Sequence, residues 1–166
     1  MLTSHELIGF MSPNLALEIL IFAHDTDKPL YRAALNAVAE ARKVRPVFLE
    51  RQPRTQRHST MLSTLTRPSL DLIAGNLIRT WLLKKYQGML VDFLDALGIV
   101  HKEGVVDDLP ETMDEAKLRA AVDVLLGKYP PEVVVVYLQA FNEMNEVEWP
   151  SLKTMLEGDA RLQLRG

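Results

Sequence analysis

The chain of 166 residues contains no cysteine. Without thiols it has no disulfide framework, no thiolate metal site and no cysteine nucleophile. It also lacks an uncharged apolar run of about 18 residues, so no transmembrane helix is expected. The first basic residue, Lys28, follows the short apolar run 15–23 instead of preceding it, so no secretory leader is predicted. We therefore expect a cytoplasmic protein with no membrane partner.

Aromatic residues are scarce, at 7% of the chain, and none of the eight glycines belongs to a phosphate-binding loop. We assign no catalytic residue and expect no cofactor. Apolar residues make up 48% of the chain and charged residues 25%, which is the usage of a globular protein. The length predicts a single domain covering residues 1–166.

Charge is unevenly distributed along the chain, although the net charge is only −3. Residues 42–91 carry ten basic and two acidic side chains, whereas residues 92–166 carry fifteen acidic and seven basic ones. Such an asymmetry is typical of a surface for nucleic acid or another partner. The alternative is that the two parts attract each other within the fold or across a homodimer.

The spacing of apolar residues predicts an all-α protein of about seven to nine helices. Ser12 and Asp27 are cap residues, and a helical pattern follows each of them. Residues 13–24 are apolar on most faces, which predicts a buried helix at the centre of the fold. In the next helix, apolar residues recur at helical spacing: Leu30, Ala33, Ala34, Ala37, Val38 and Ala41.

Two segments interrupt the helical pattern. Three prolines divide the irregular Pro/Arg-rich segment 44–68, in which residues 54–66 are predicted to form a helix of low intrinsic propensity. Residues 98–113 form a long loop without helical periodicity, and a small β-hairpin near 99–106 is one alternative for part of it. Thr112 and Glu115 have the spacing of a capping box at the start of the following helix.

An internal repeat indicates two similar helical hairpins in the C-terminal two-thirds of the chain. The string LLKKY at 82–86 matches LLGKY at 125–129, and FLDAL at 93–97 matches YLQAF at 137–141. The valine run 133–136 fits a strand by propensity, but the first copy is clearly helical, so we predict a helix in the second. Chance similarity between amphipathic helices is the alternative explanation.

Two longer strings resemble known sequences. FLDALGIVHKEGVVDDLP at 93–110 and KLRAAVDVLLGKYPPEVVVVYLQAF at 117–141 resemble segments of small, all-helical bacterial proteins that are described only as uncharacterised. The resemblance covers roughly the C-terminal half of the chain. It implies a self-contained helical domain of bacterial origin and implies no activity, so no functional residue is carried over from it.

One short string points to metal chemistry. FAHDTDKP at 22–29 is similar to the His-Asp dipeptide of the HD-domain phosphohydrolases, which are all-helical and metal-dependent. By that resemblance His24 and Asp25 would share a divalent ion that activates a bound water. The alternative is that Asp25 is a turn residue and His24 lies at a helix C-terminus, where a cation is favoured. Further ligands would come from other helices: His5, and Asp92 or Asp95.

The basic segment 42–67 offers a second kind of site. Arg51, Arg54 and Arg57 recur at every third position, so they would line one ridge of a continuous helix. Arginine binds phosphate through two parallel hydrogen bonds, and such a ridge suits a nucleic-acid backbone or another anionic surface. The alternative is a solvated face, or pairing with the acidic C-terminal half.

These observations favour a non-enzymatic helical protein-interaction module that binds a protein partner or self-associates. The first alternative is a nucleic-acid-associated protein that uses the basic segment 42–67. The second is a metal-dependent HD-type phosphohydrolase with its metal at His24 and Asp25.

Overall fold

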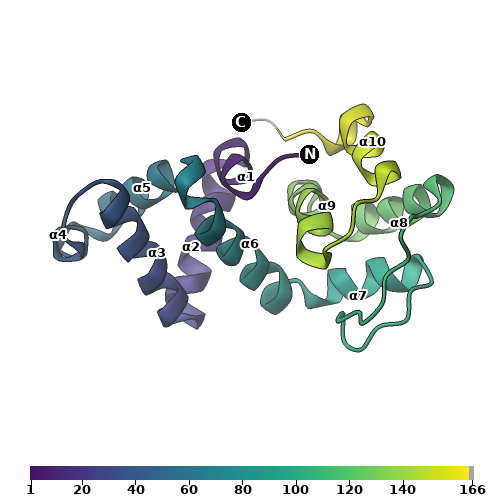
Figure 1. The fold of residues 1–166 in the computed structure, drawn as a ribbon, viewed down its shortest axis with the longest axis horizontal. Coiled ribbons are helices and arrows are strands. Elements are labelled where there is room, and N and C mark those ends of the chain that lie inside the picture. Colours follow the sequence, from purple (N-terminus) through teal and green to yellow (C-terminus); the bar gives the residue numbers. More distant parts are fainter. Residues whose placement is uncertain (165–166) are drawn as a thin grey trace. The chain divides into compact units, whose positions relative to one another are not determined.

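The computed structural model describes residues 1–164, which form ten α-helices, two 3₁₀ helices and no β-strand (Figure 1). The all-α prediction is confirmed. The helices outnumber the expected seven to nine because two short ones form, α1 (Ser4–Phe10) and α4 (Pro46–Arg51).

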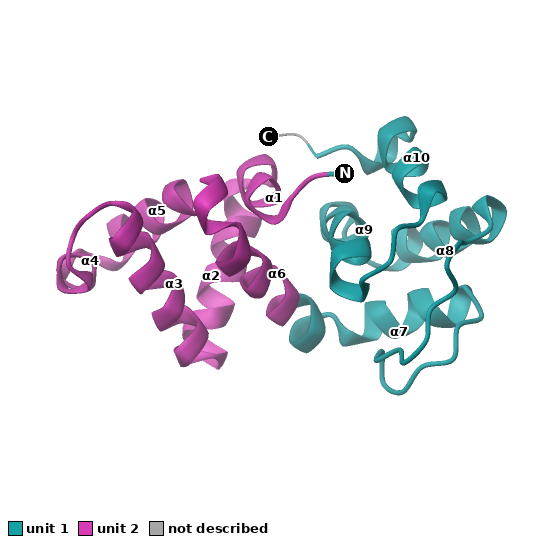
Figure 2. Cartoon of the chain, viewed as in Figure 1, with its two compact units in different colours: residues 1, 82–164 teal, residues 2–81, 165–166 magenta. Residues whose placement is uncertain are grey.

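The contacts within the chain fall into two compact units, and the prediction of one domain for residues 1–166 stays a prediction. The N-terminal unit comprises residues 2–81, and the C-terminal unit comprises Met1 and residues 82–164 (Figure 2). The boundary lies inside α6 (Asp71–Lys85), between Trp81 and Leu82. No proline- or glycine-rich linker marks this boundary, because the helix continues through it.

The N-terminal unit is organised around α3 (Lys28–Ala41) and α5 (Arg54–Leu65). α3 contacts α2 (Pro13–Thr26), α4 and α5, and α5 also contacts α1 and α2. A 3₁₀ turn, η1 (Pro68–Leu70), leads into α6. The irregular segment 44–68 thus folds as two helices, and the helix predicted over 54–66 is present as α5.

Two predicted helix caps are confirmed. The side chain of Ser12 accepts a hydrogen bond from the amide of Leu15 at 3.3 Å, and a proline follows at the first position of α2. Asp27 accepts from the amide of Leu30 at 3.2 Å and starts α3 in the same way. Each cap satisfies an amide that the first turn of a helix leaves without a partner.

The buried faces of α2 and α3 differ from the predicted ones. α2 is expected to be buried all round, but Leu17, Ile21 and Phe22 are only half-buried, since α3 and α5 cover one side of it. In α3 the buried face contains Leu35, whereas Ala33 is exposed. Turning Leu35 inward removes more apolar surface from water than turning the smaller Ala33 inward.

The C-terminal unit contains four complete helices and a short turn: α7 (Gln87–Ala96), α8 (Glu115–Lys128), α9 (Pro131–Asn145), α10 (Pro150–Gly158) and η2 (Ala160–Leu162). Its core holds a cluster of aromatic rings in which Phe141 lies 5.3 Å from Phe93, 5.8 Å from Tyr137 and 4.8 Å from Trp149, between ring centroids. The valine run 133–136 lies in α9 and is buried, so its prediction as helix is confirmed.

The repeat does not fold as two hairpins. Only Tyr86 separates α6 from α7, and one residue is shorter than the connections that turn one helix back onto another. The most extensive packing in the C-terminal unit is between α7 and α8, which belong to different copies of the repeat.

The loop between α7 and α8 also differs in detail from the prediction. The possible hairpin near 99–106 is reduced to one antiparallel bridge between Lys102 and Val105, without strands in the described chain. The cap of α8 is Asp114, whose carboxylate accepts from the amide of Lys117 at 3.1 Å, and not the box that begins at Thr112.

The aromatic cluster predicts the effect of one core substitution. Phe141→Ala removes the ring that contacts Phe93, Tyr137 and Trp149, and we expect the free energy of unfolding to fall by about 3–5 kcal/mol. Val124→Ala is the control, because Val124 is 48% exposed on α8 of the same unit; it should change the value by less than about 0.5 kcal/mol. Urea denaturation followed by circular dichroism measures both. Equal effects of the two substitutions would contradict this account of the core.

Candidate functional site

α4 is a six-residue helix between two prolines. Pro46 is its first residue, and Pro53 precedes α5. Proline suits the first turn of a helix, but it disfavours a helical residue before it, so α4 stops before Pro53. Leu49 is the buried residue of α4, with 2% exposure, and anchors this short helix on the N-terminal unit.

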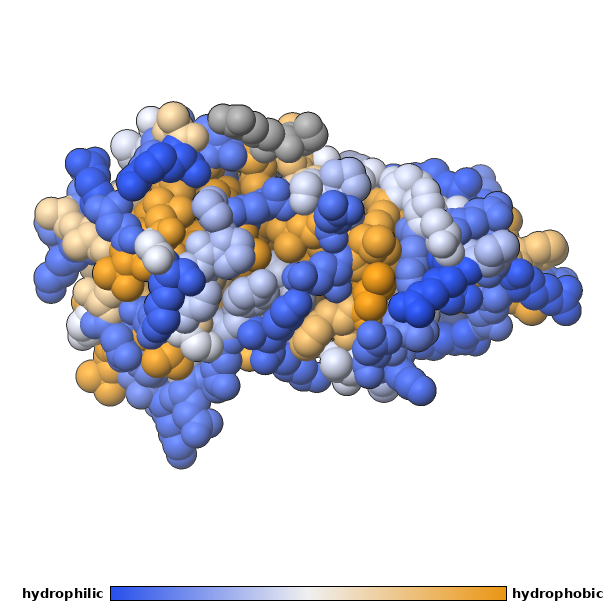
Figure 3. Space-filling model, turned by 180° about the vertical axis from the view of Figure 1, so that it is seen from behind, coloured by the Kyte–Doolittle hydropathy of each residue, from blue (hydrophilic) through white to orange (hydrophobic). Residues whose placement is uncertain are grey.

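The outward side of α4 is apolar. Phe48 is 60% exposed, Val47 is 37% exposed, and Val44, just before the helix, is 40% exposed. The amide of Val44 donates to the carbonyl oxygen of Ala39 at 3.0 Å, which fixes Val44 against the end of α3. Apolar atoms are visible among hydrophilic ones at the end of the N-terminal unit that α4 forms (Figure 3).

A hollow of about 380 Å³ lies beside these apolar side chains. It opens between the end of α3, α4 and α5, and its lining is Arg42, Val44, Phe48, Leu49, Gln52, Gln56 and Thr60. The hollow therefore extends the exposed apolar surface of Phe48 into a concave site, which is the shape that receives a side chain of a partner.

The cations of the basic segment divide into two groups. Three of them form hydrogen bonds within the N-terminal unit: Arg42 donates to the Thr64 hydroxyl at 3.3 Å, Arg57 to the Glu50 carbonyl at 3.4 Å, and Arg67 to the Ala41 carbonyl at 3.1 Å. Four others are exposed, and their side chains form no hydrogen bond or ion pair within residues 1–164: Lys43, Arg45, Arg51 and Arg54. We call these four cations together with Val44, Val47 and Phe48 the α4 face.

The predicted arginine ridge is interrupted. Arg51 is the last residue of α4 and Arg54 is the first residue of α5, so Arg51, Arg54 and Arg57 do not lie on one continuous helix. Arg57 is half-buried and engaged with the backbone of α4. Of the three predicted residues, Arg51 and Arg54 remain exposed and available to an anionic partner.

His24 and Asp25 lie at the end of α2 and hydrogen-bond to each other at 2.8 Å. The hydrogen bond from His24 lowers the pKa of the Asp25 carboxyl. The His24 ring stands edge-on to the ring of Tyr31, with 4.9 Å between centroids, and the Tyr31 hydroxyl lies 3.0 Å from Nε2 of His58. The pair therefore belongs to a small polar and aromatic cluster on α2, α3 and α5.

His58 is the buried member of that cluster, with 2% exposure. Its pKa is lowered to about 4, chiefly by burial and to a smaller extent by the nearby cations Arg57 and Arg54. His58 is thus neutral at pH 7 and contributes a polar contact to Tyr31 within the unit.

The further residues predicted for an HD-type metal site have other partners. Within residues 1–164, no three His, Asp or Glu side chains are grouped so that they would hold a metal ion. Each candidate ligand outside α2 is paired with a side chain of its own unit: His5 with Asp71 at 2.7 Å, Asp95 with His101 at 2.6 Å, and Asp92 with Lys128 at 2.8 Å and with Tyr129.

The loop between α7 and α8 combines acidic side chains with exposed apolar ones, as the α4 face combines basic side chains with exposed apolar ones. We call residues 98–114 the acidic loop, which carries five acidic side chains and one basic one. Val100 and Val105 in this loop are 90% and 62% exposed. Four of its carboxylates are exposed and form no ion pair within the described chain: Glu103, Asp107, Asp108 and Glu111.

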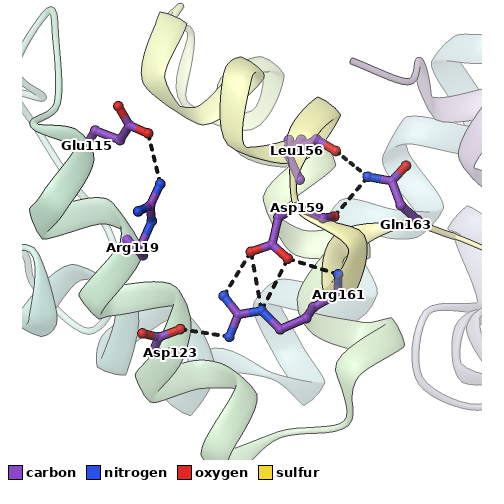
Figure 4. Close-up of polar contacts among 7 residues, drawn as sticks. All are labelled: Glu115, Arg119, Asp123, Leu156, Asp159, Arg161 and Gln163. Carbon is purple, nitrogen blue, oxygen red and sulfur yellow. Dashed lines mark hydrogen bonds and ion pairs between the residues drawn. The ribbon is translucent and has the colours of Figure 1, made fainter.

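Acidic residues of α8, by contrast, stabilise the C-terminal unit itself. Arg161 bonds to Asp159 at 2.8 Å and to Asp123 of α8 at 3.0 Å, and Arg119 bonds to Glu115 at 3.0 Å (Figure 4). The pair between Arg161 and Asp123 holds the segment after α10 against α8. These carboxylates are therefore already neutralised, and those of the acidic loop are not.

Sequence reasoning identified the cations near α4 and missed the apolar centre of the face. The available signal was the pair of prolines, Pro46 and Pro53, which bracket the apolar string at 47–49. A helix this short has room to bury one of three consecutive apolar residues, so the other two are left outside.

Comparisons with known proteins find no match to this chain. No protein-family model matches the chain, and no curated protein and no solved structure matches it either. Among the described helices, none is long and apolar enough to cross a membrane. The function is therefore inferred from the chemistry of the surface.

The buried, neutral His58 predicts a loss of stability on mild acidification. The unfolded chain takes up a proton on this residue near pH 6.5, whereas the folded chain does so only near pH 4, so between these values the unfolded state binds more protons. We expect the free energy of unfolding to fall from pH 7 to pH 5, and His58→Gln to reduce that fall. Urea denaturation at both pH values measures it. An unchanged pH dependence in His58→Gln would contradict the assignment.

Proposed function

We propose that the protein is a non-enzymatic interaction module, acting in the cytoplasm, whose α4 face binds an acidic polypeptide segment that also carries apolar side chains. The observation that carries this proposal is Phe48, a 60% exposed aromatic ring among cations whose side chains form no hydrogen bond or ion pair within residues 1–164. An exposed large apolar residue beside a hollow is typical of a binding surface.

The apolar part of the face supplies the driving force for binding. Complete burial of a side chain such as Phe48 contributes about 1.5–3 kcal/mol, and Val44 and Val47 add to it. Aromatic and arginine side chains are the residues that most often dominate binding energy at interfaces. Charged residues around an apolar centre form the polar rim that such interfaces have.

The cations determine which partners are attracted. Segment 42–67 carries seven basic residues and one acidic residue, Glu50, whose carboxylate pairs with Arg32. The four unpaired cations therefore present a positive surface that attracts acidic partners and repels basic ones. Because these charges are exposed, salt screens the attraction, and binding is expected to weaken as ionic strength rises.

The apolar centre favours a polypeptide over a nucleic acid. A sugar-phosphate backbone satisfies the cations but leaves Val44, Val47 and Phe48 without an apolar partner. Single-stranded nucleic acids bind by stacking bases on several aromatic rings, and Phe48 is the single aromatic residue of the α4 face. An acidic segment with leucine-like side chains satisfies both parts of the face.

The proposal predicts binding of a simple probe. A fluorescently labelled synthetic peptide in which pairs of glutamates alternate with pairs of leucines should bind at low salt, as measured by anisotropy. Phe48→Ala should weaken this binding by about tenfold or more, because the central aromatic contact is lost. Leu72→Ala is the matched control, since Leu72 is 79% exposed on α6 of the same unit and outside the face.

Two outcomes would contradict the proposal. One is that the peptide does not bind, or binds Phe48→Ala as tightly as the unsubstituted protein. The other is that a single-stranded oligonucleotide binds more tightly than the peptide, depends on Arg51 and Arg54, and is insensitive to Phe48→Ala. That second result would support the nucleic-acid alternative.

A further inference from the structure

The acidic loop carries the two kinds of side chain that the α4 face is proposed to bind, acidic ones and apolar ones. It combines two valines that are more exposed than Phe48 with four carboxylates that have no ion pair in the described chain. With five acids and one base, residues 98–114 are as strongly acidic as segment 42–67 is basic. Each surface therefore offers an exposed apolar side chain, and the charges of the two surfaces are opposite.

We infer that the acidic loop of one copy of the chain binds the α4 face of a second copy. This inference rests on the proposed function, because it names the partner of the same face. Phe48 is 60% exposed on the N-terminal unit and Val100 is 90% exposed on the C-terminal unit, so neither side chain is covered by its own unit. A second copy is the partner of known sequence that carries both the carboxylates and the apolar side chains.

The first part of the acidic loop is fixed in shape before it binds. His101 accepts a hydrogen bond from the amide of Gly104 at 3.1 Å through Nδ1, and its Nε2 is bonded to Asp95 at 2.6 Å. The bridge between Lys102 and Val105 closes the same turn. Both nitrogens of the imidazole thus hold the turn. Of the two exposed valines, Val100 precedes the turn and Val105 closes it.

The second part of the loop is tied to α10 and its approach. The indole nitrogen of Trp149 donates to the carbonyl oxygen of Pro110 at 2.8 Å, and the hydroxyl of Ser151 donates to that of Met113 at 2.8 Å. A surface that is held in place loses little conformational entropy on binding. The loop is therefore a preformed ligand and not a segment that must fold first.

The contact joins two different surfaces. Two copies that exchange loops make it twice around a two-fold axis, which gives an isologous dimer, and copies that do not close in this way form longer chains through heterologous contacts. In either case the attraction is between exposed charges, so association is expected to be stronger at low ionic strength.

Charge reversal on each surface tests the pairing. The first variant is R45E/R51E, which cancels the net positive charge of the α4 face; the second is D107K/D108K, which cancels the net negative charge of the loop. Each variant alone should self-associate at least about tenfold more weakly than the unsubstituted protein, because one of the two surfaces then has no net charge to attract the other and carries repulsive charges at the substituted positions. Sedimentation velocity across a range of protein concentrations at low salt gives the association constants.

Mixing the two variants gives the decisive result. The unchanged loop of the first variant then meets the unchanged face of the second, so one contact with its full charge complementarity is restored. We expect the mixture to associate, although each component alone does so weakly. The control K28E/R79E reverses two exposed charges at the start of α3 and in α6 of the same unit, and it should leave self-association unchanged.

Three results would overturn the inference: an unsubstituted protein that stays monomeric at every concentration, self-association that D107K/D108K leaves unchanged, or a mixture that does not associate. If the glutamate-leucine peptide still binds the unsubstituted protein in a manner that needs Phe48, the α4 face remains a binding site and only its partner is wrong. If that peptide does not bind either, the proposed function fails as well.

Discussion

The α4 face exists because two prolines limit α4 to six residues. Pro46 starts the helix and Pro53 prevents its continuation into α5, so Leu49 alone reaches the core. A longer helix would bury a stripe of apolar residues, whereas this one must leave Val47 and Phe48 in water. The same break separates Arg51 from Arg54, which spreads the cations around the apolar side chains instead of aligning them on one ridge.

The net charge of −3 hides a difference in charge between the two units. Residues 2–81 carry ten bases and seven acids, and residues 82–164 carry eight bases and fifteen acids. Within each unit, some of these charges are neutralised by neighbours, as Arg161 is by Asp123 and Asp159. The exposed charges without ion pairs include those around Phe48 on one unit and those beside Val100 and Val105 on the other.

Much of the fold is predictable because its signals are local. The caps at Ser12 and Asp27 and the apolar periodicity of α9 depend on residues within one or two turns. The buried face of α3 was misjudged because its alanines make neighbouring stripes almost equally apolar, and tertiary packing of Leu35 decides between them. The candidate site was predicted for its cations only. The exposure of Phe48 depends on how Leu49 packs α4 against the N-terminal unit, and this tertiary contact cannot be predicted from the neighbouring residues in the sequence.

Hydrogen exchange of the unsubstituted chain at low salt tests the central claim most directly, because it locates the contact without changing any residue. We expect that raising the protein concentration slows amide exchange in two segments, residues 44–57 and residues 98–108, and leaves exchange in the core of α9 unchanged. High salt should remove that protection in both segments together. Protection that appears in one of these segments without the other, or in neither, would contradict it.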